Sequence, residues 1–257
     1  MGRLFLGELI GTFLLVLFGC GSVAAAVYHG AFSSLFEVDL AWGIGIALAI
    51  FASRSLSPSH LNPAVSIAFC LSGHNKPKEL PALVLGQFAG AILAATLLFF
   101  WFEPSIETFE NAQGFVRGDS ASFASAMAFG EFFPNPDFPQ VTGMTPLKAA
   151  LCEGGGTAVL MFVIYRLIEK QEDVDNTTPL FIGLTVSLLV ILIAPFTQAG
   201  FNPARDFGPR LVAYFAGWGN AAFPDASGSF FTVYILAPIL GASLAGVLER
   251  SRLKLNR

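Results

Sequence analysis

Two copies of the tripeptide Asn-Pro-Ala carry the most distinctive chemistry in the sequence. The copies are Asn62-Pro63-Ala64 and Asn202-Pro203-Ala204. They lie 140 residues apart, and each follows a long apolar run. Asn is a favoured N-cap and Pro is favoured at the first helical position. Each triplet therefore predicts the start of a helix, extending to about Ser72 in the first copy and to about Gly217 in the second.

Two such short helices could build a pore. Ten helical residues at ~1.5 Å each cover ~15 Å, about half of a ~30 Å hydrocarbon core. Half-helices that enter from opposite sides would meet near the bilayer centre. Their positive N-terminal ends and both Asn amides would then point into one space.

Two acidic residues in apolar segments repeat in the same way. Glu8 and Glu153 each begin a Glu-x-x-Gly-Thr motif, and the two motifs are 145 residues apart. A carboxylate inside a membrane span is costly and usually functional. Such a carboxylate either relays protons or braces the adjoining re-entrant loop by accepting hydrogen bonds from its N–H groups. Non-helical backbone at membrane depth needs hydrogen-bond partners, and this favours the brace.

The segments that must position these residues are those of a membrane protein. Of the residues, 54% are hydrophobic and 12% are charged, and the mean hydropathy is +0.66. Six apolar segments are expected to span the membrane: Leu4–Ala26, Leu40–Ser53, Leu80–Phe102, Ala149–Ile168, Leu180–Thr197 and Phe230–Leu248. These long unalternating runs predict helices rather than barrel strands. The expected fold is an all-α membrane protein with six transmembrane helices and two re-entrant half-helices.

The repeats predict one domain over 1–257 with inverted internal symmetry. Repeat one covers about 1–102, an outer loop 103–146, and repeat two about 147–257. Three spans in each half give the halves opposite orientations. The loop is long, Phe-rich and punctuated by Pro, and we expect it to pack over the outer mouth.

Loop charge predicts the orientation. With six spans and both termini on one side, that side holds ten of the fourteen basic residues: Arg3, Arg54, Lys76, Lys78, Arg166, Lys170, Arg250, Arg252, Lys254 and Arg257. The positive-inside rule then places both termini in the cytoplasm, with the chain in the plasma (inner) membrane.

Catalysis and nucleic-acid binding are not expected. The net charge is −4, with no basic patch for a nucleic acid. The sequence has no nucleotide-binding loop, metal-ligand cluster or nucleophile–base pairing, so we expect no cofactor and no metal. The three cysteines lie in apolar segments and are expected to be buried thiols.

The paired motifs resemble the major intrinsic proteins, the family of aquaporins and glycerol facilitators, over roughly Arg3–Arg250. Asp206, which follows Asn202-Pro203-Ala204-Arg205, is similar to the glycerol-conducting branch. The resemblance implies a homotetramer in which each protomer has its own pore for glycerol, other small neutral solutes and water. It also implies structural roles for Asp206 and for His60, whose imidazole could instead respond to pH.

The family also has a narrower filter outside the Asn pair, and the resemblance assigns it to Trp42, Val190, Ala199 and Arg205. Arg205 would offer fixed N–H donors to hydroxyls and repel cations, while Trp42 would face the carbon backbone. A Trp near a helix start is otherwise often an interfacial anchor. Glycerol facilitators usually have Gly and Phe at the positions of Val190 and Ala199. The set found here is more similar to nodulin-26-like channels, which implies water, urea, lactic acid or metalloid hydroxides as alternative solutes.

Two other classes remain open. A proton-coupled secondary transporter could also use inverted repeats and half-helices, and would need titratable groups such as Glu8 and Glu153 in its pathway. A structural junction protein would not require both Asn-Pro-Ala motifs and a complete filter. A passive channel accounts for all of these features.

Overall fold

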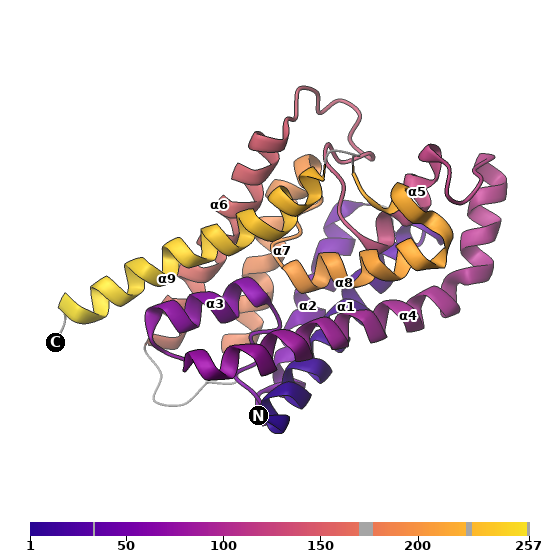
Figure 1. Cartoon of the computed structure of the whole chain (residues 1–257). Coiled ribbons are helices and arrows are strands. Elements are labelled where there is room, and N and C mark those ends of the chain that lie inside the picture. Colours follow the sequence, from indigo (N-terminus) through magenta and orange to yellow (C-terminus); the bar gives the residue numbers. More distant parts are fainter. Residues whose placement is uncertain (33, 170–176, 225–227, 256–257) are drawn as a thin grey trace.

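The computed structural model describes the chain except for residues 33, 170–176, 225–227 and 256–257. Two basic residues used for the orientation, Lys170 and Arg257, lie outside the described residues. The described part is helical and contains no strand. Figure 1 shows long helices surrounding two short ones, α3 and α8.

Within the described residues, six helices are long and apolar enough to cross a membrane. Their bounds are α1 (Gly2–His29), α2 (Leu35–Ser53), α4 (Leu80–Gln113), α6 (Pro146–Glu169), α7 (Thr178–Thr197) and α9 (Ala237–Leu255), the last preceded by a π-helical stretch, Phe231–Leu236. The short helices are α3 (Pro63–Ser72), α5 (Phe123–Ala126) and α8 (Pro203–Ala213). The expected fold, six spans with two half-helices that begin at the Asn-Pro-Ala motifs, is confirmed.

Several helix ends differ from the sequence-based bounds. α8 ends at Ala213 rather than at about Gly217, whose φ of 108° is not helical, and α9 runs to Leu255 rather than Leu248. α2 begins at Leu35 rather than Leu40, because Ser34 and Glu37 form a capping box that starts the helix earlier. α4 does not end at Phe102 but continues through Pro104 to Gln113. Its added turns bury Ile106 completely, and this burial favours continuation of the helix. The connection between α4 and α6 is therefore shorter than expected.

The helices pack in matching pairs. α1 contacts α2 and α4, as α6 contacts α7 and α9, and α2 contacts α7 between the repeats. Each half-helix lies against the last span of the other repeat, α3 on α9 and α8 on α4 (Figure 1). Equivalent neighbours in the two halves are what an inverted repeat requires.

Glycines set the closest helix contacts. A Cβ at Gly43 would lie 2.7 Å from the carbonyl oxygen of Gly183, and one at Gly183 would lie 2.2 Å from that of Gly43. A Cβ at Gly241 of α9 would approach the Gly154 oxygen of α6 to 1.9 Å. Such backbone-to-backbone contacts are possible only without a side chain, as in other membrane bundles.

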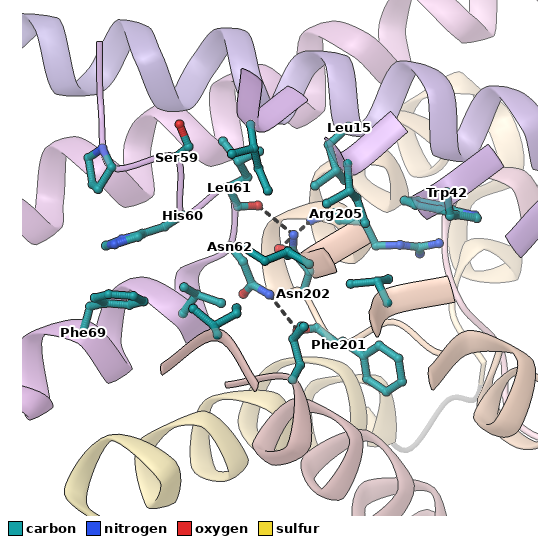
Figure 2. Close-up of a pocket in the computed structure, with 18 of the residues that line it drawn as sticks. Leu15, Trp42, Ser59, His60, Leu61, Asn62, Phe69, Phe201, Asn202 and Arg205 are labelled. Atoms are coloured by element: carbon teal, nitrogen blue, oxygen red, sulfur yellow. Dashed lines mark hydrogen bonds between the residues drawn. The ribbon is translucent and has the colours of Figure 1, made fainter. Parts of the chain in front are cut away.

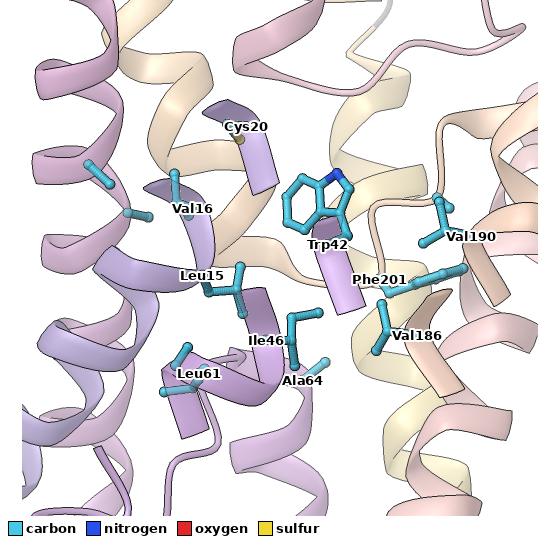
Figure 3. Packing of buried hydrophobic residues seen from close by; sticks show 14 of the residues in the cluster. Leu15, Val16, Cys20, Trp42, Ile46, Leu61, Ala64, Val186, Val190 and Phe201 are labelled. Atoms are coloured by element: carbon cyan, nitrogen blue, oxygen red, sulfur yellow. The ribbon is translucent and has the colours of Figure 1, made fainter. Parts of the chain in front are cut away.

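The buried apolar residues lie inside this bundle. Figure 3 shows Trp42 and Ile46 of α2 facing Val186 and Val190 of α7 across the centre. Large apolar side chains on the outer faces are exposed, including Leu85, Phe100 and Trp101 of α4. A bundle with apolar surfaces on both sides of its helices fits a lipid environment.

Candidate pore

The two Asn-Pro-Ala motifs meet at the centre of the bundle (Figure 2). Asn62 Nδ2 donates to the carbonyl oxygen of Phe201 at 2.9 Å, and Asn202 Nδ2 donates to that of Leu61 at 2.7 Å. Asn62 Oδ1 accepts from Ala64 N at 2.9 Å, in the N-cap arrangement that the sequence predicts. Each side-chain amide thus caps its own helix and ties it to the loop of the other repeat.

Asn202 caps α8 in the same way. Its Oδ1 accepts from Ala204 N at 3.1 Å and from Arg205 N at 3.3 Å. An amide nitrogen carries two hydrogens, and each Asn uses one of them on the opposite carbonyl. The second hydrogen of each amide is therefore available to a solute at the point where the helices meet.

The backbone before each motif is held in an unusual conformation. Leu61 and Phe201, which directly precede the two asparagines, both have φ 54°, and Ala199 has φ 62°. This left-handed region is unfavourable for residues other than Gly, so the surrounding contacts must enforce it. It exposes the carbonyl groups of the loops, including the two that accept from the asparagines.

Two fully buried carboxylates supply those contacts. Glu8 accepts from the N–H groups of His60, at 3.0 Å, and Leu61, at 2.7 Å. It also accepts from Ser57 Oγ and Gln87 Nε2, both at 2.8 Å. Four donors thus converge on one buried carboxylate, and two of them are backbone N–H groups of the loop before Asn62.

Glu153 occupies the equivalent place in the second repeat. It accepts from the N–H groups of Gly200, at 2.9 Å, and Phe201, at 2.7 Å. Thr197 Oγ1 donates to it at 2.6 Å, as Ser57 donates to Glu8. Both acids named by the repeat analysis therefore contact the loops that end in Asn-Pro-Ala.

A cavity of about 200 Å³ lies at the point where the two Asn-Pro-Ala motifs meet. Its lining combines polar and apolar side chains (Figure 2). The polar residues include His60, Asn62, Asn202 and Arg205, and the apolar ones include Leu15, Trp42, Ile46, Val186, Val190, Ala199 and Phe201. All four residues assigned to the filter by resemblance line the same cavity.

Arg205 lies between an aromatic ring and an acid. Its guanidinium carbon is 4.2 Å from the centroid of the Trp42 ring. Its Nη1 forms an ion pair with Glu131 of the outer loop, and both side chains are buried. Burial strengthens such contacts, because water does not screen them.

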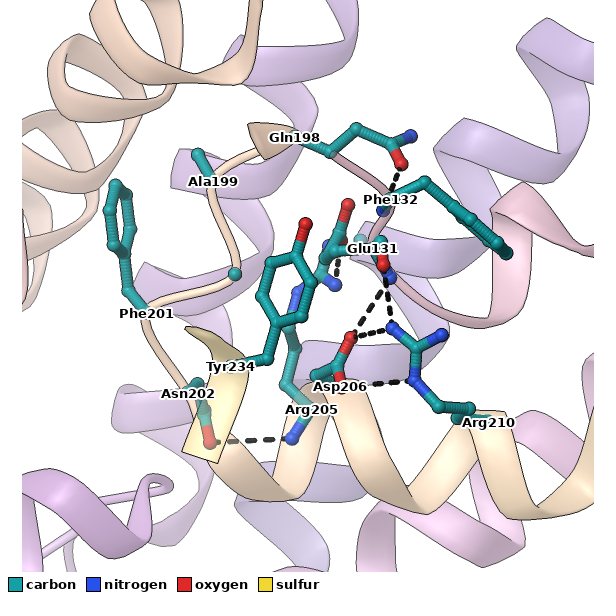
Figure 4. A network of polar contacts seen from close by, with 12 residues as sticks. Glu131, Phe132, Gln198, Ala199, Phe201, Asn202, Arg205, Asp206, Arg210 and Tyr234 are labelled. Atoms are coloured by element: carbon teal, nitrogen blue, oxygen red, sulfur yellow. Dashed lines mark hydrogen bonds and ion pairs between the residues drawn. The ribbon is translucent and has the colours of Figure 1, made fainter. Parts of the chain in front are cut away.

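The outer loop is fixed around this pair by Asp206 and Arg210 (Figure 4). Arg210 is fully buried and donates to Asp206 through Nε, at 3.1 Å, and Nη2, at 2.6 Å. Asp206 Oδ1 also accepts from Glu131 N at 2.9 Å, and Arg210 Nη2 donates to the Glu131 carbonyl at 2.7 Å. Asp206 therefore does not face a solute but joins α8 to the loop above it.

His60 lies in the loop before Asn62 and also lines the cavity. Its Nδ1 lies 3.1 Å from Ser66 Oγ, and its ring stacks on Phe69 with the centroids 4.5 Å apart. These contacts fix the orientation of the imidazole within the first repeat.

A second cluster holds the start of the outer loop. Arg117 pairs with Glu110 at 2.9 Å and with Glu103 at 2.8 Å, and its guanidinium lies 4.5 Å from the Trp218 ring centroid. Burial alone would lower the pKa of Arg117, but the hydrogen bonds to Glu110 and Glu103 raise it above its ordinary value. Arg117 thus anchors the start of the outer loop to the extension of α4.

The sequence interpretation missed Glu131 and most of the apolar wall. The wall could have been found by spacing, because Ile46 lies one helical turn from Trp42, and Val186 one turn from Val190. Glu131 gives a weaker signal, as a single acid before two Phe residues in the outer loop. Its pairing with Arg205 depends on the path of the loop, which no local pattern determines.

Comparisons with known proteins agree with this geometry. The family model described as Major intrinsic protein matches residues 1–248. The chain is 40% identical over 242 residues to a glycerol uptake facilitator protein of Pseudomonas aeruginosa, covering 93% of this chain and 84% of that protein. It is 35% identical over 247 residues to a propanediol uptake facilitator of Salmonella typhimurium, covering 95% and 90%.

The fold is similar to a solved structure as well. The X-ray structure of the aquaglyceroporin from Plasmodium falciparum matches with a TM-score of 0.81 and 24% identity, covering 98% of this chain and 96% of that one. Together with the paired half-helices at the pore centre, the family match identifies this multi-pass membrane protein as a member of the major intrinsic protein family.

Proposed function

We propose that the chain is a passive channel for glycerol and other small neutral solutes, water included. The observation that carries this proposal is the composition of the cavity lining, in which a few polar groups lie among many apolar side chains. A small polyol has hydroxyls along one edge and carbon along the other, and fits such a lining without leaving polar groups unpaired. Relatives named for glycerol and propanediol uptake support this solute class.

The narrow filter is formed by Trp42, Val190, Ala199 and Arg205 in this proposal. Arg205 donates to solute hydroxyls, and the Trp42 ring contacts their carbon atoms. The cation–π contact of 4.2 Å supports this assignment, since it holds the guanidinium plane against one wall. Val190 and Ala199 then set the width of the remaining opening.

The centre of the pore is formed by the two Asn-Pro-Ala motifs. Asn62 and Asn202 each offer one amide hydrogen to a passing solute, and the positive ends of α3 and α8 oppose cations. Pro63 and Pro203 start the helices, while Ala64 and Ala204 are small and fully buried behind the asparagines.

Glu8 and Glu153 brace the loops in this proposal and do not relay protons. Each accepts two backbone N–H bonds and a hydroxyl bond from the loop before a motif. His60 adds a contact between the first of these loops and Ser66 of α3, and Asp206 adds one between α8 and the outer loop. With these acids engaged, passive transport is favoured over a proton-coupled transporter and over any enzymatic role.

A broader solute range is the second candidate for selectivity. Ala199 has only a methyl group beside the cavity, and Val190 narrows the wall that it shares with Val186. This shape favours compact solutes such as urea, protonated lactic acid or boric acid relative to a linear polyol.

The channel is placed in the plasma (inner) membrane as a homotetramer with both termini in the cytoplasm. Basic residues at the inner helix ends support the orientation, and the exposed apolar faces of the helices would contact lipid or neighbouring protomers. Native mass spectrometry from mild detergent tests the tetramer, and monomers alone would contradict it.

Stopped-flow light scattering of proteoliposomes tests the transport proposal. We expect fast glycerol entry with a low activation energy, and no potassium or proton current across a planar bilayer. Ion conductance comparable to the glycerol flux, or flux that follows a proton gradient, would refute passive transport of neutral solutes.

A further inference from the structure

Glu131 is the charged residue nearest the filter that no motif predicts. Its side chain is 4% exposed and forms an ion pair with Arg205, which is 5% exposed. A buried charge left without a partner is strongly unfavourable, so this pair compensates both groups. The guanidinium is therefore held between an acid on one side and the Trp42 ring on another.

The position of Glu131 is fixed by its backbone. Glu131 N donates to Asp206 and its carbonyl accepts from Arg210, as described above. The next residue, Phe132, donates its N–H to Gln198 Oε1 at 2.6 Å. The loop is thus attached to α8 and to the segment before Asn202, and the acid is not a freely moving surface side chain.

Positively charged groups face the pore from other directions. The N-termini of α3 and α8 both point to its centre, and Arg205 adds a full charge nearby. Helix N-termini together with an arginine are a common binding site for small anions. Such a site would hold an oxyanion in the opening through which neutral solutes must pass.

We propose that Glu131 determines specificity by keeping small anions out of the filter. Its carboxylate accepts hydrogen bonds from the Arg205 guanidinium that an oxyanion would otherwise accept, and it neutralises the positive charge of Arg205. Arg205 then retains other N–H donors for solute hydroxyls. The inference rests on the filter role of Arg205 proposed above.

Nitrate inhibition of glycerol flux tests this. Proteoliposomes contain equal concentrations of sodium nitrate, or of sodium gluconate as a larger anion, on both sides. At low salt concentrations the wild-type glycerol flux should be the same in nitrate and in gluconate. Glu131→Gln should conduct glycerol in gluconate but be inhibited by nitrate at a concentration about tenfold lower than wild type requires, equivalent to about 1.4 kcal/mol.

Two further variants separate charge pairing from structure. Glu131→Asp keeps the charge at a shorter reach, and its nitrate sensitivity should fall between those of wild type and Glu131→Gln. Asp137→Asn removes an exposed acid from the same loop and should behave as wild type. If Glu131→Gln does not fold, the nitrate sensitivity of Glu131→Asp relative to wild type is the deciding measurement, and an unchanged sensitivity would overturn the proposal.

The outcomes are distinct. Equal nitrate sensitivity in wild type and the Glu131 variants, with glycerol flux intact, would overturn the role of Glu131 alone. Equal sensitivity in Asp137→Asn and Glu131→Gln would assign the effect to general loop charge and would also overturn it. Absence of glycerol flux in the wild type would instead contradict the proposed channel.

Discussion

The brace at Glu153 makes a quantitative prediction for Glu153→Gln. The carboxylate accepts from Thr197 and Gly200 through one oxygen and from Phe201 through the other. An amide group presents an NH₂ where one oxygen was, so one backbone N–H loses its acceptor. An unpaired buried donor costs about 1–3 kcal/mol, and the remaining bonds weaken when the charge is removed. We expect a total loss of about 3 kcal/mol.

For a chain of this size, that loss corresponds to a fall in melting temperature of about 10 °C. The assay is thermal unfolding of the purified protein in detergent, followed by size-exclusion elution, with Glu107→Gln as control because Glu107 is exposed on α4. Folded yield should fall, while the ratio of glycerol to urea permeability per folded molecule stays constant. Equal melting temperatures in the two variants, with a changed pH dependence of flux in Glu153→Gln, would refute the brace and favour a proton relay.

The other predictions concern the filter and the helix contacts. Ala199→Phe should raise the permeability of glycerol relative to boric acid by several-fold, and Val190→Gly should speed the passage of linear polyols. Each substitution changes the shape of the opening beside Trp42. Unchanged permeability ratios in stopped-flow assays would exclude both residues from the filter. Gly241→Ala should lose most of its folded yield, since the added methyl would meet the Gly154 carbonyl at 1.9 Å, whereas Gly155→Ala, with open space around it, should elute as wild type. Similar size-exclusion profiles for those two would contradict the tight contact of α6 with α9.

Much of the architecture could be predicted because membrane burial acts on long segments. Apolar runs and the two Asn-Pro-Ala motifs predicted the six spans and the starts of α3 and α8, which the structure confirms. The predicted end of α4 was wrong, since Phe102 closes the apolar run but the helix continues and buries Ile106. That burial depends on tertiary packing and leaves no local signal.

The site residues that belong to the internal repeat could be predicted, and those that depend on contacts between distant segments could not. Glu8 and Glu153 follow the repeat, and both contact the loops that were expected. Glu131 reaches Arg205 from a loop more than seventy positions away, which sequence spacing alone cannot predict. The roles of the filter residues remain predictions that transport measurements must test.

The packing of each half-helix against the last span of the other repeat has a consequence for folding during synthesis. A Cβ at Gly246 of α9 would lie 2.7 Å from the Ala68 oxygen of α3, so the groove that receives this early helix belongs to the last span. At about 5–20 residues per second of synthesis, α3 waits on the order of ten seconds or more for its partner to leave the ribosome. Meanwhile its polar N-terminus and the loop before it are paired only within the first repeat, through Glu8. Glu8 thus stabilises the loop before α3 in the nascent chain as well as in the folded protein, until the second repeat has been synthesised.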